Sequence, residues 1–456
     1  MLGPRTRLAL LFFGREGTPL MAWPLYNYDV ERKINELMSE CEAWCENECE
    51  FVIKKWIKTR EDFEDVLSKS SEIDGLIIYV LTTSINYDLF YNVVRVLSKP
   101  TLVLTEPYHS LAWPEIAGLM REGYSVIGVS SSSREDRVRG VKVLHTYIKL
   151  RQRVKVLVIT VPEEMSLESL HRHEIYSGDR VYSDSYYKRL REFMDLIFVD
   201  YAELMNTYSS ISDDDARKVA VTLLKNSYWV REDIKTEDVV KALKIYIALK
   251  KLLNKYGAEA LAINCFTIML KDLNALPTTP CVAISLLNDE GIPAACEADL
   301  SSLLLQVIFK YLVKKPAWIS DPVIDFSDNS VTYAHCTAPT KMKGFAEEPE
   351  PYALDTHDES GKPVVIRTKM SLGQVITVAQ VSPDFSKLYL HVNKIVDTPV
   401  VDLACRTKIK TLVKNAREWL WEYKQPLHRV VVYGDWSYEL SMLSKLMKLE
   451  IQYEPE

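Results

Sequence analysis

A long apolar run is missing from this sequence. The run near its start, Leu8–Phe13, is too short for the apolar part of a signal peptide or for a membrane span. An excess of basic residues is missing as well: 56 Lys and Arg stand against 63 Asp and Glu, a formal net charge of -7. These features argue against a membrane span and against nucleic acid or an anionic membrane as a partner. We therefore expect a cytoplasmic protein.

Two common cofactor motifs are also missing. No Gly-x-Gly-x-x-Gly follows the first apolar strand, which argues against a dinucleotide cofactor. The eight cysteines contain no Cys-x-x-Cys, and without a secretory signal we expect reduced thiols. Cys41, Cys45 and Cys49 recur every four residues, which predicts three thiols along one helix face, packed as small apolar side chains.

What the sequence does contain is an alternation of apolar strands and amphipathic helices. Its 456 residues are enough for two or three domains. The alternation predicts two doubly wound α/β domains, residues 1–152 and 153–321, because buried parallel strands read as continuous apolar runs. Residues 322–456 are richer in strand patterns and predict a β-rich α+β domain that ends in an α/β segment. In that last domain, residues 407–423 read as a helix.

Three short segments of the second domain read as extended. They span residues 264–267, 280–285 and 294–299, and each contains a cysteine or a polar residue. Ligands of open α/β sheets bind where strands end, so three such segments within about forty residues predict one cleft.

The third segment carries two carboxylates, Glu297 and Asp299, inside an apolar run. Charge in such a place needs a metal, a cation or several donors to replace its hydration. If the segment is extended, side chains two residues apart share a face, and both carboxylates would point at one cation. The alternative is that they cap the helix that begins near Leu300, because acids favour helix amino termini. The residues alone leave these two interpretations even.

Five short motifs follow one another in a characteristic order: Asn264–Phe266, Pro280–Cys281, Gly291–Leu300, Tyr333–Cys336 and Leu427–Asp435. In this order and spacing they resemble the L-fucose isomerase-like branch of the L-fucose/L-arabinose isomerase superfamily. The resemblance covers roughly residues 190–456. It implies two α/β domains and a largely β-structured C-terminal domain, with the active site in a cleft that neighbouring subunits of a homo-oligomer, a trimer or hexamer, help to close.

The resemblance also implies a cofactor and a ligand set. The family interconverts aldoses and ketoses with a metal, usually Mn²⁺ but also Mg²⁺ or Co²⁺, held by a glutamate, an aspartate and a histidine. By motif, the aspartate falls on Asp299 and the histidine on His428. The place of the glutamate falls on Cys281, a departure from the family pattern, and we expect Glu297 to replace it. Glu297 and Asp299 would then also move the proton.

The chemistry explains these residue types. Moving a hydrogen between C1 and C2 of a sugar through an enediolate needs a base, an acid and a cation across the two oxygens. We therefore expect a metal-dependent isomerase of a fucose- or arabinose-like sugar. A non-catalytic sugar-binding or regulatory protein, or a lyase or epimerase with the same chemistry, is the alternative.

Several other residues have both a functional and a structural interpretation. His335 and Cys281 are expected to contact the sugar, although His335 can equally be an ordinary residue at a strand end, and His428 can be a structural hydrogen-bonding residue. Lys341 and Lys343 can bind an acidic sugar substituent or simply face solvent. Four cysteines read as packed thiols more readily than as a soft-metal site. They are Cys265, Cys281, Cys296 and Cys336.

Overall fold

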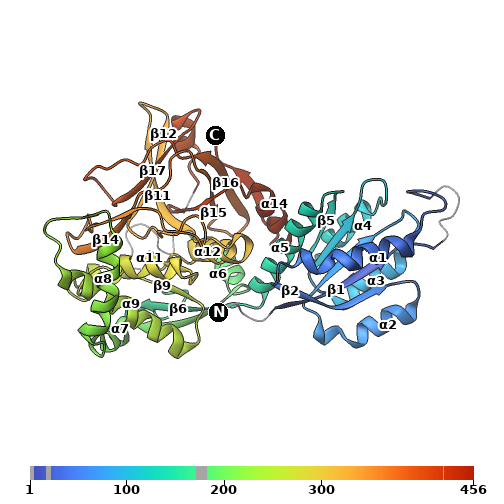
Figure 1. Ribbon diagram of the computed structural model, residues 1–456, viewed down its shortest axis with the longest axis horizontal. Coiled ribbons are helices and arrows are strands. Elements are labelled where there is room, and N and C mark those ends of the chain that lie inside the picture. The colour runs from blue at the N-terminus through green and yellow to red at the C-terminus, as the bar shows by residue number, and fades with distance from the viewer. Residues whose placement is uncertain (1–4, 17–21, 171–181, 425, 456) are drawn as a thin grey trace. The chain divides into compact units, whose positions relative to one another are not determined.

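The chain forms two compact units in the computed structural model, which describes residues 5–16, 22–170, 182–424 and 426–455 (Figure 1). The first unit comprises residues 1–152 and 438–449, and the second comprises residues 153–437 and 450–456. The multidomain α/β class expected from the sequence is confirmed. The division into three domains at residues 152 and 321 stays a prediction. Among the described residues, no helix is long and apolar enough to cross a membrane.

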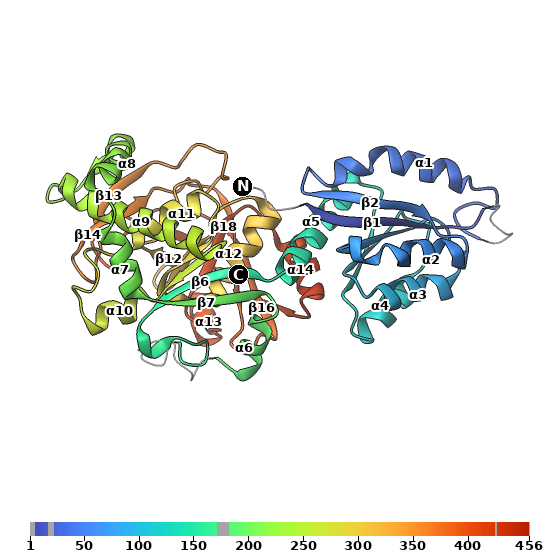
Figure 2. The ribbon, with the colours of Figure 1, turned by 90° about the horizontal axis from the view of Figure 1, so that it is seen from below.

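The first unit is built on a five-stranded parallel sheet in the order β2-β1-β3-β4-β5. Strand β1 (Thr6–Phe13), which lies between β2 and β3, is buried along almost its whole length, as its apolar run predicts. Figure 2 shows α1 on one side of β1 and β2, with α2, α3 and α4 on the other. The remaining elements are β2 (Cys49–Trp56), β3 (Gly75–Val80), β4 (Thr101–Thr105), β5 (Val126–Ser130), α1 (Val30–Glu40), α2 (Arg60–Ser68), α3 (Tyr87–Leu97), α4 (Trp113–Arg121), α5 (Arg134–Arg151) and α14 (Ser437–Leu446).

The four-residue spacing of Cys41, Cys45 and Cys49 predicts that they share one helix face. In the structure they do not. Helix α1 ends at Glu40, and a 3₁₀ turn, η1 (Cys41–Trp44), follows it. The chain then turns through Glu46 and Asn47, both at positive φ, and Cys49 begins β2. This turn brings Cys45 and Cys49 together in a disulfide, so the expectation of reduced thiols is wrong for this pair.

The second unit begins with a four-stranded parallel sheet in the order β10-β9-β6-β7. Two segments expected to be extended are helical here, α10 (Cys265–Lys271) and α11 (Cys281–Asp289). Asn264 caps α10 by accepting a hydrogen bond from the Thr267 backbone N–H, which starts a helix where the apolar run alone does not distinguish helix from strand. The other elements are β6 (Val154–Thr160), β7 (Met194–Asp200), β9 (Ala260–Ile263), β10 (Ala294–Ala295), α6 (Asp184–Leu190), α7 (Tyr201–Ser209), α8 (Asp213–Asn226) and α9 (Thr236–Tyr256).

The rest of the second unit is rich in strands. A seven-stranded mixed sheet has the order β17-β12-β11-β18-β15-β16-β19, and a three-stranded sheet has the order β14-β13-β8. The expected helix over 407–423 is instead a strand and a short helix, because Thr407, Ile409 and Thr411 alternate with more polar positions and pair with β12. The elements are β8 (Trp229–Val230), β11 (Trp318–Asp325), β12 (Ser330–His335), β13 (Tyr352–Thr356), β14 (Pro363–Thr368), β15 (Val375–Val381), β16 (Lys387–Lys394), β17 (Thr407–Leu412), β18 (Arg429–Tyr433), β19 (Glu450–Tyr453) and α13 (Ala416–Trp421).

Helix α12 (Leu300–Val313) connects the sheets of this unit. It is buried on all sides over most of its length and packs against β9 and β10 of the parallel sheet and against β15 and β18 of the mixed sheet. The ends of these strands therefore converge near the first turn of α12, where the carboxylates noted in the sequence lie.

Candidate metal centre

The carboxylate segment lies in a tight turn rather than in a strand. Strand β10 pairs with β9 and leads into a 3₁₀ turn, η4 (Cys296–Ala298). Within η4, Glu297 and Ala298 adopt φ values of 56° and 49°. A left-handed conformation costs a non-glycine residue roughly 1–2 kcal/mol. The prediction of an extended segment is wrong, because this turn rotates the Glu297 side chain away from the strand direction.

The turn brings Glu297 to two histidines. Glu297 Oε1 lies 3.5 Å from Nε2 of His335, and Glu297 Oε2 lies 3.6 Å from Nε2 of His428. The two imidazole rings meet edge to face, 5.6 Å apart. One ligand atom from each of the three residues lies within 4.8 Å of the others. Since ligand atoms lie roughly 2.0–2.6 Å from a bound divalent ion, this spacing matches one cation with three protein ligands.

Each histidine is placed by a strand of the mixed sheet. His335 is the last residue of β12, and His428 directly precedes β18. Both side chains are buried. Arg429, fully buried, donates to the backbone carbonyls of Pro426 and Lys424 and so fixes the segment before His428.

Asp299 performs the capping role, one of the two that the sequence left open, and it also contacts His428. Its Oδ1 accepts from the Ser302 backbone N–H and from the Ser301 hydroxyl, so it caps α12. Its Oδ2 accepts from the Ser302 hydroxyl and lies 2.8 Å from Nδ1 of His428. A carboxylate at Nδ1 fixes the imidazole tautomer that leaves Nε2 free to bind a metal. Direct metal ligation by Asp299 stays a prediction.

Asp321 completes the surroundings of His428. It lies in β11, and its Oδ1 is 3.5 Å from Nε2 of His428. Both atoms are buried and lack a hydrogen-bond partner among the described residues. Buried polar atoms are rarely left unpaired unless a water or an ion contacts them. A divalent cation that takes oxygen and imidazole ligands, such as Mn²⁺, fits this donor set.

The charges reinforce one another. Burial lowers the pKa of His428, but the Asp299 hydrogen bond and the nearby carboxylates outweigh it and raise this pKa to about 10. Burial raises the pKa of Glu297, yet the two histidines bring it down to about 2. His428 also holds the pKa of Asp299 well below its usual range, against the effect of burial. The site is therefore a buried cluster of carboxylates that demands positive charge, which protonated imidazole or a metal ion can supply.

Sulfoquinovose isomerases are similar to this chain. The protein of that name from Clostridium sp. (strain MSTE9) is 24% identical over 268 residues, which cover 56% of this chain and 57% of the relative. Those of Priestia aryabhattai and Priestia megaterium (strain ATCC 12872 / QMB1551) are each 24% identical over 221 residues, 47% of this chain and 48% of the relative. The chain thus spans about half the length of the curated relatives it matches. No family model matches the sequence.

The similarity to sulfoquinovose isomerases supports the relationship to sugar isomerases that the sequence motifs suggested, but not a particular branch of them. Membership of the L-fucose isomerase-like branch stays a prediction.

Cys281, at the position of the family's glutamate, lies beside the metal centre rather than in it. It begins α11, is buried, and packs with Cys336 and Val365. The pKa of its thiol is well below the usual range, because Cys296 and His357 stabilise the thiolate against the effect of burial. His357 correspondingly has its pKa raised to about 10, although burial opposes this. A contact between Cys281 and a sugar stays a prediction.

The cysteines near the centre do not form a soft-metal group among the described residues. Cys265 and Cys296 touch, with their Sγ atoms 3.0 Å apart. All four cysteines noted in the sequence are free and buried. In the part of the chain that the structure describes, the one set of three or more ligand residues close enough to share an ion is Glu297, His335 and His428. The packed-thiol interpretation agrees with this arrangement.

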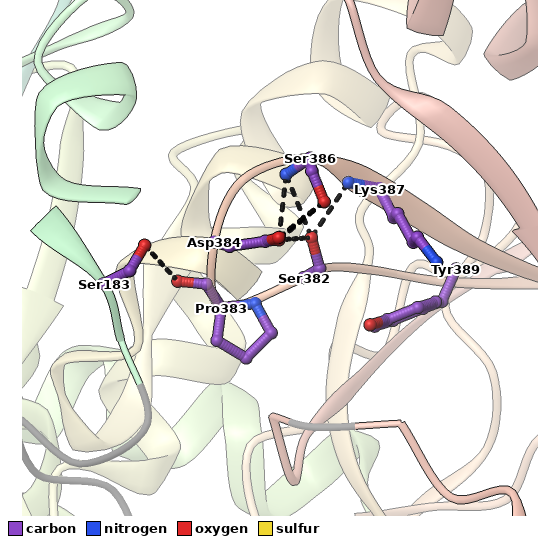
Figure 3. Close-up of a pocket in the computed structure, with 7 residues that line it drawn as sticks. All are labelled: Ser183, Ser382, Pro383, Asp384, Ser386, Lys387 and Tyr389. Carbon is purple, nitrogen blue, oxygen red and sulfur yellow. Dashed lines mark hydrogen bonds between the residues drawn. The ribbon is translucent and has the colours of Figure 1, made fainter. Parts of the chain in front are cut away.

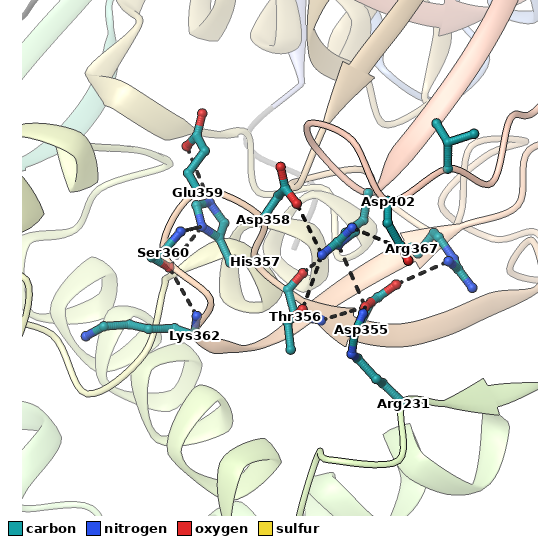
Figure 4. A network of polar contacts seen from close by, with 12 residues as sticks. Arg231, Asp355, Thr356, His357, Asp358, Glu359, Ser360, Lys362, Arg367 and Asp402 are labelled. Carbon is teal, nitrogen blue, oxygen red and sulfur yellow. Dashed lines mark hydrogen bonds and ion pairs between the residues drawn. The ribbon is translucent and has the colours of Figure 1, made fainter.

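Most cations near the centre already have partners. Lys341 donates to the Phe345 carbonyl, and Lys343 pairs with Glu350. Three arginines surround the buried Asp355 in the network of Figure 4, which also contains His357 and Glu359. The arginines are Arg231, Arg367 and Arg406. Lys343 is thus paired with a carboxylate, whereas Lys341 has only a backbone carbonyl as its partner. An anion-binding role for either lysine stays a prediction.

A separate pocket of about 320 Å³ lies at the turn between β15 and β16 (Figure 3). Ser382 and Ser386 donate to Asp384 there, and Lys387 Nζ donates to Gln452. These bonds stabilise the turn itself. The pocket contains none of the three residues of the metal centre.

Sequence reasoning missed Asp321 and His357. Asp321 lies on a strand whose partners are known only once the register is known, and His357 lies in a segment with the composition of a loop. For Asp321 the only signal was an acidic residue within an apolar run next to Pro322, which also occurs at ordinary strand edges.

Proposed function

We propose that this protein is a metal-dependent sugar isomerase that interconverts an aldose and a ketose. The observation that carries the proposal is the group formed by the buried His335 and His428 with the partly exposed Glu297. Nε2 of His428 lacks a hydrogen-bond partner among the described residues and faces two carboxylates. The similarity to sulfoquinovose isomerases supports the same class of reaction. Fucose- and arabinose-like sugars, expected from the sequence motifs, remain candidate substrates beside sulfonated ones.

The three residues would hold a divalent cation, which we propose to be Mn²⁺. Such an ion, when bound, stabilises negative charge on the two sugar oxygens at C1 and C2. Glu297 and the imidazole Nε2 atoms supply the ligands, and Asp299 keeps His428 in the right tautomer. Burial of His335, His428 and Asp299 strengthens the electrostatic interactions of these side chains.

We assign the proton transfer to the predicted Glu297 and Asp299. Against the effect of burial, the neighbouring histidines lower the pKa values of both carboxyl groups, so both are ionised and able to accept a proton. Each positioned proton transfer contributes about 10²–10⁴-fold to the rate.

The proposal is tested by metal analysis and by assay of one panel of aldoses. The purified protein is analysed for bound metal and incubated with neutral and anionic aldoses in the presence of Mn²⁺, Mg²⁺ or Co²⁺, and ketose formation is measured. We expect one metal per chain and ketose formation, both lost in Glu297→Gln. The matched control is Glu290→Gln, which removes a half-exposed carboxylate paired with Lys250.

Two results would contradict the proposal. Unchanged metal binding in Glu297→Gln would show that Glu297 is not a metal ligand. Sugar binding without turnover under any metal would instead identify a sugar-binding or regulatory protein.

A further inference from the structure

Lys408 is a buried cation without an acidic partner. Its side chain is 7% exposed, and its Nζ donates to the backbone carbonyl of Val401 at 3.1 Å. No carboxylate among the described residues pairs with it. Its neighbours differ: Arg406 contacts three aspartates, and Lys410 pairs with Asp328. An ammonium group carries three donors, so Lys408 retains the capacity to bind an anion.

The strand register places Lys408 in the same row as Asp321 and as His428, one of the three residues of the metal centre. Lys408 of β17 lies opposite Ala334 of β12, and Ala334 lies opposite Asp321 of β11. Asp321 in turn contacts His428, just before β18. Directly opposed residues of neighbouring strands point to the same face of a sheet. The row His428, Asp321, Ala334, Lys408 therefore follows one face across four adjacent chain segments.

The spacing of this row matches the size of a sugar. Two strand spacings of about 4.8 Å each separate Lys408 from Asp321, so the two backbones lie about 10 Å apart. The residue between them, Ala334, is buried and has a small side chain. An open-chain hexose with C1 and C2 at the metal centre would be long enough for its far end to reach Lys408.

Lys408 also interacts electrostatically with residues near the metal centre. It interacts with Cys405 and Asp358, and Cys405 interacts with Asp321 and Glu359. Burial lowers the pKa of Lys408, with Arg406 contributing in the same direction. Burying an ammonium group costs free energy that an anion at this place would offset. A protein without a ligand for this charge would gain stability from an apolar residue here.

We propose that Lys408 recognises an anionic substituent, such as a sulfonate or a phosphate, at the end of the sugar remote from the metal centre. This inference rests on the proposed function, since it assumes that the reacting end of the sugar binds at Glu297, His335 and His428. It names the substrate class as an anionic aldose. Lys408 is then a specificity-determining residue that takes no part in the proton transfer.

The test compares two charged sugars with a neutral one. A 6-sulfonated aldohexose, its 6-phosphorylated counterpart and the 6-deoxy sugar are assayed with wild type, Lys408→Met and Lys408→Arg. We expect Lys408→Met to lower kcat/KM for the preferred charged sugar about 10- to 100-fold, as loss of a charged hydrogen bond does, and to leave the neutral sugar within about twofold. Lys408→Arg should retain the preference for charge. Whichever charged sugar responds identifies the substituent.

Lys410→Met is the control, because it removes a lysine from the same strand that is paired with Asp328. Equal losses for charged and neutral sugars, or no loss for any, would overturn the inference while the isomerase proposal stands. If wild type turns over no sugar, binding of the same three sugars is measured by calorimetry. A preference for the charged sugar that disappears in Lys408→Met then still supports the inference, and the absence of any such preference overturns it.

Discussion

Nε2 of His428 and Oδ1 of Asp321 lie 3.5 Å apart, and both are buried without a hydrogen-bond partner among the described residues. The two residues are 107 positions apart in the sequence, yet adjacent segments of one sheet place them side by side. A shared cation or a bound water accounts for two such atoms at this distance. Asp321 is thus the residue through which the role of the metal centre can be tested without altering its three proposed ligands.

Asp321→Asn should lower the affinity for Mn²⁺ about 10- to 100-fold, as the loss of groups adjoining metal ligands typically does. Competition with a fluorescent chelator measures this affinity. Asp325→Asn is the control, since Asp325 lies on the same strand and accepts from Ser327 at the exposed end. If both variants bound Mn²⁺ with the affinity of wild type, Asp321 would have no role in metal binding.

Asp299→Asn and Asp299→Ala should differ in stability but agree in metal binding. Asparagine still caps α12, whereas alanine does not and should cost about 1 kcal/mol. Alanine has no acceptor for Nδ1 of His428, and an asparagine whose amide oxygen caps α12 presents its NH2 donor there. Both variants should therefore weaken metal binding and activity strongly. Thermal unfolding and metal titration of the two variants provide the measurements. An asparagine variant with normal metal binding would show that His428 needs no anionic partner.

Breaking the buried ion pair of Arg429 and Glu454 should lower the free energy of unfolding by about 3–5 kcal/mol, because it leaves a buried charge unpaired. Glu454→Gln tests this in urea titrations followed by tryptophan fluorescence. The exposed pair of Arg153 and Asp195 provides the comparison, and Asp195→Asn should cost less than about 1 kcal/mol. If Glu454→Gln and Asp195→Asn lowered the free energy of unfolding by similar amounts, burial of the ion pair would not explain its contribution to stability.

Asp289 should make stability depend on pH below neutrality. Burial raises its pKa to about 6, although it accepts hydrogen bonds from Thr340 and Lys341. The unfolded chain has a pKa of roughly 3.9 there, so the folded state binds the extra proton and stability falls as pH rises from about 4 to about 6.

Asp289→Asn removes this titration. Over the same pH interval the stability of the variant relative to wild type should therefore rise, by about 2–3 kcal/mol. Unfolding midpoints measured at pH 4, 5, 6 and 7 give the difference directly. A difference that stays constant with pH would show that Asp289 is not protonated in the folded state.

The alternation of elements was predictable because it depends on local patterns. The apolar run Leu8–Phe13, noted in the sequence as the first strand, forms most of β1. The same reasoning failed for α10 and α11, since short apolar runs satisfy helix and strand patterns alike and the capping residues decide.

The candidate site was predictable only in part. The order of short motifs pointed to Asp299 and His428 as metal ligands, Glu297 was inferred as the third, and His335 was expected to contact the sugar. The fold brings Glu297, His335 and His428 together. Asp321 and Lys408 were not found, because their importance depends on which strands lie next to each other and in which register. The turn at Glu297 was missed as well, since two successive positive φ values have no sequence signature when neither residue is glycine.

Asp299, the residue that caps helix α12, also contacts the imidazole of His428. The Leu303 backbone N–H donates to the Asp299 carbonyl, and the Ser302 N–H donates to its side chain, so the first turn of the helix and the orientation of the imidazole share one set of bonds. Fraying of that turn would release the histidine before the rest of the helix unwinds. Metal binding should therefore slow the exchange of these two amide hydrogens with solvent, and the temperature at which the turn opens would set the upper limit of activity.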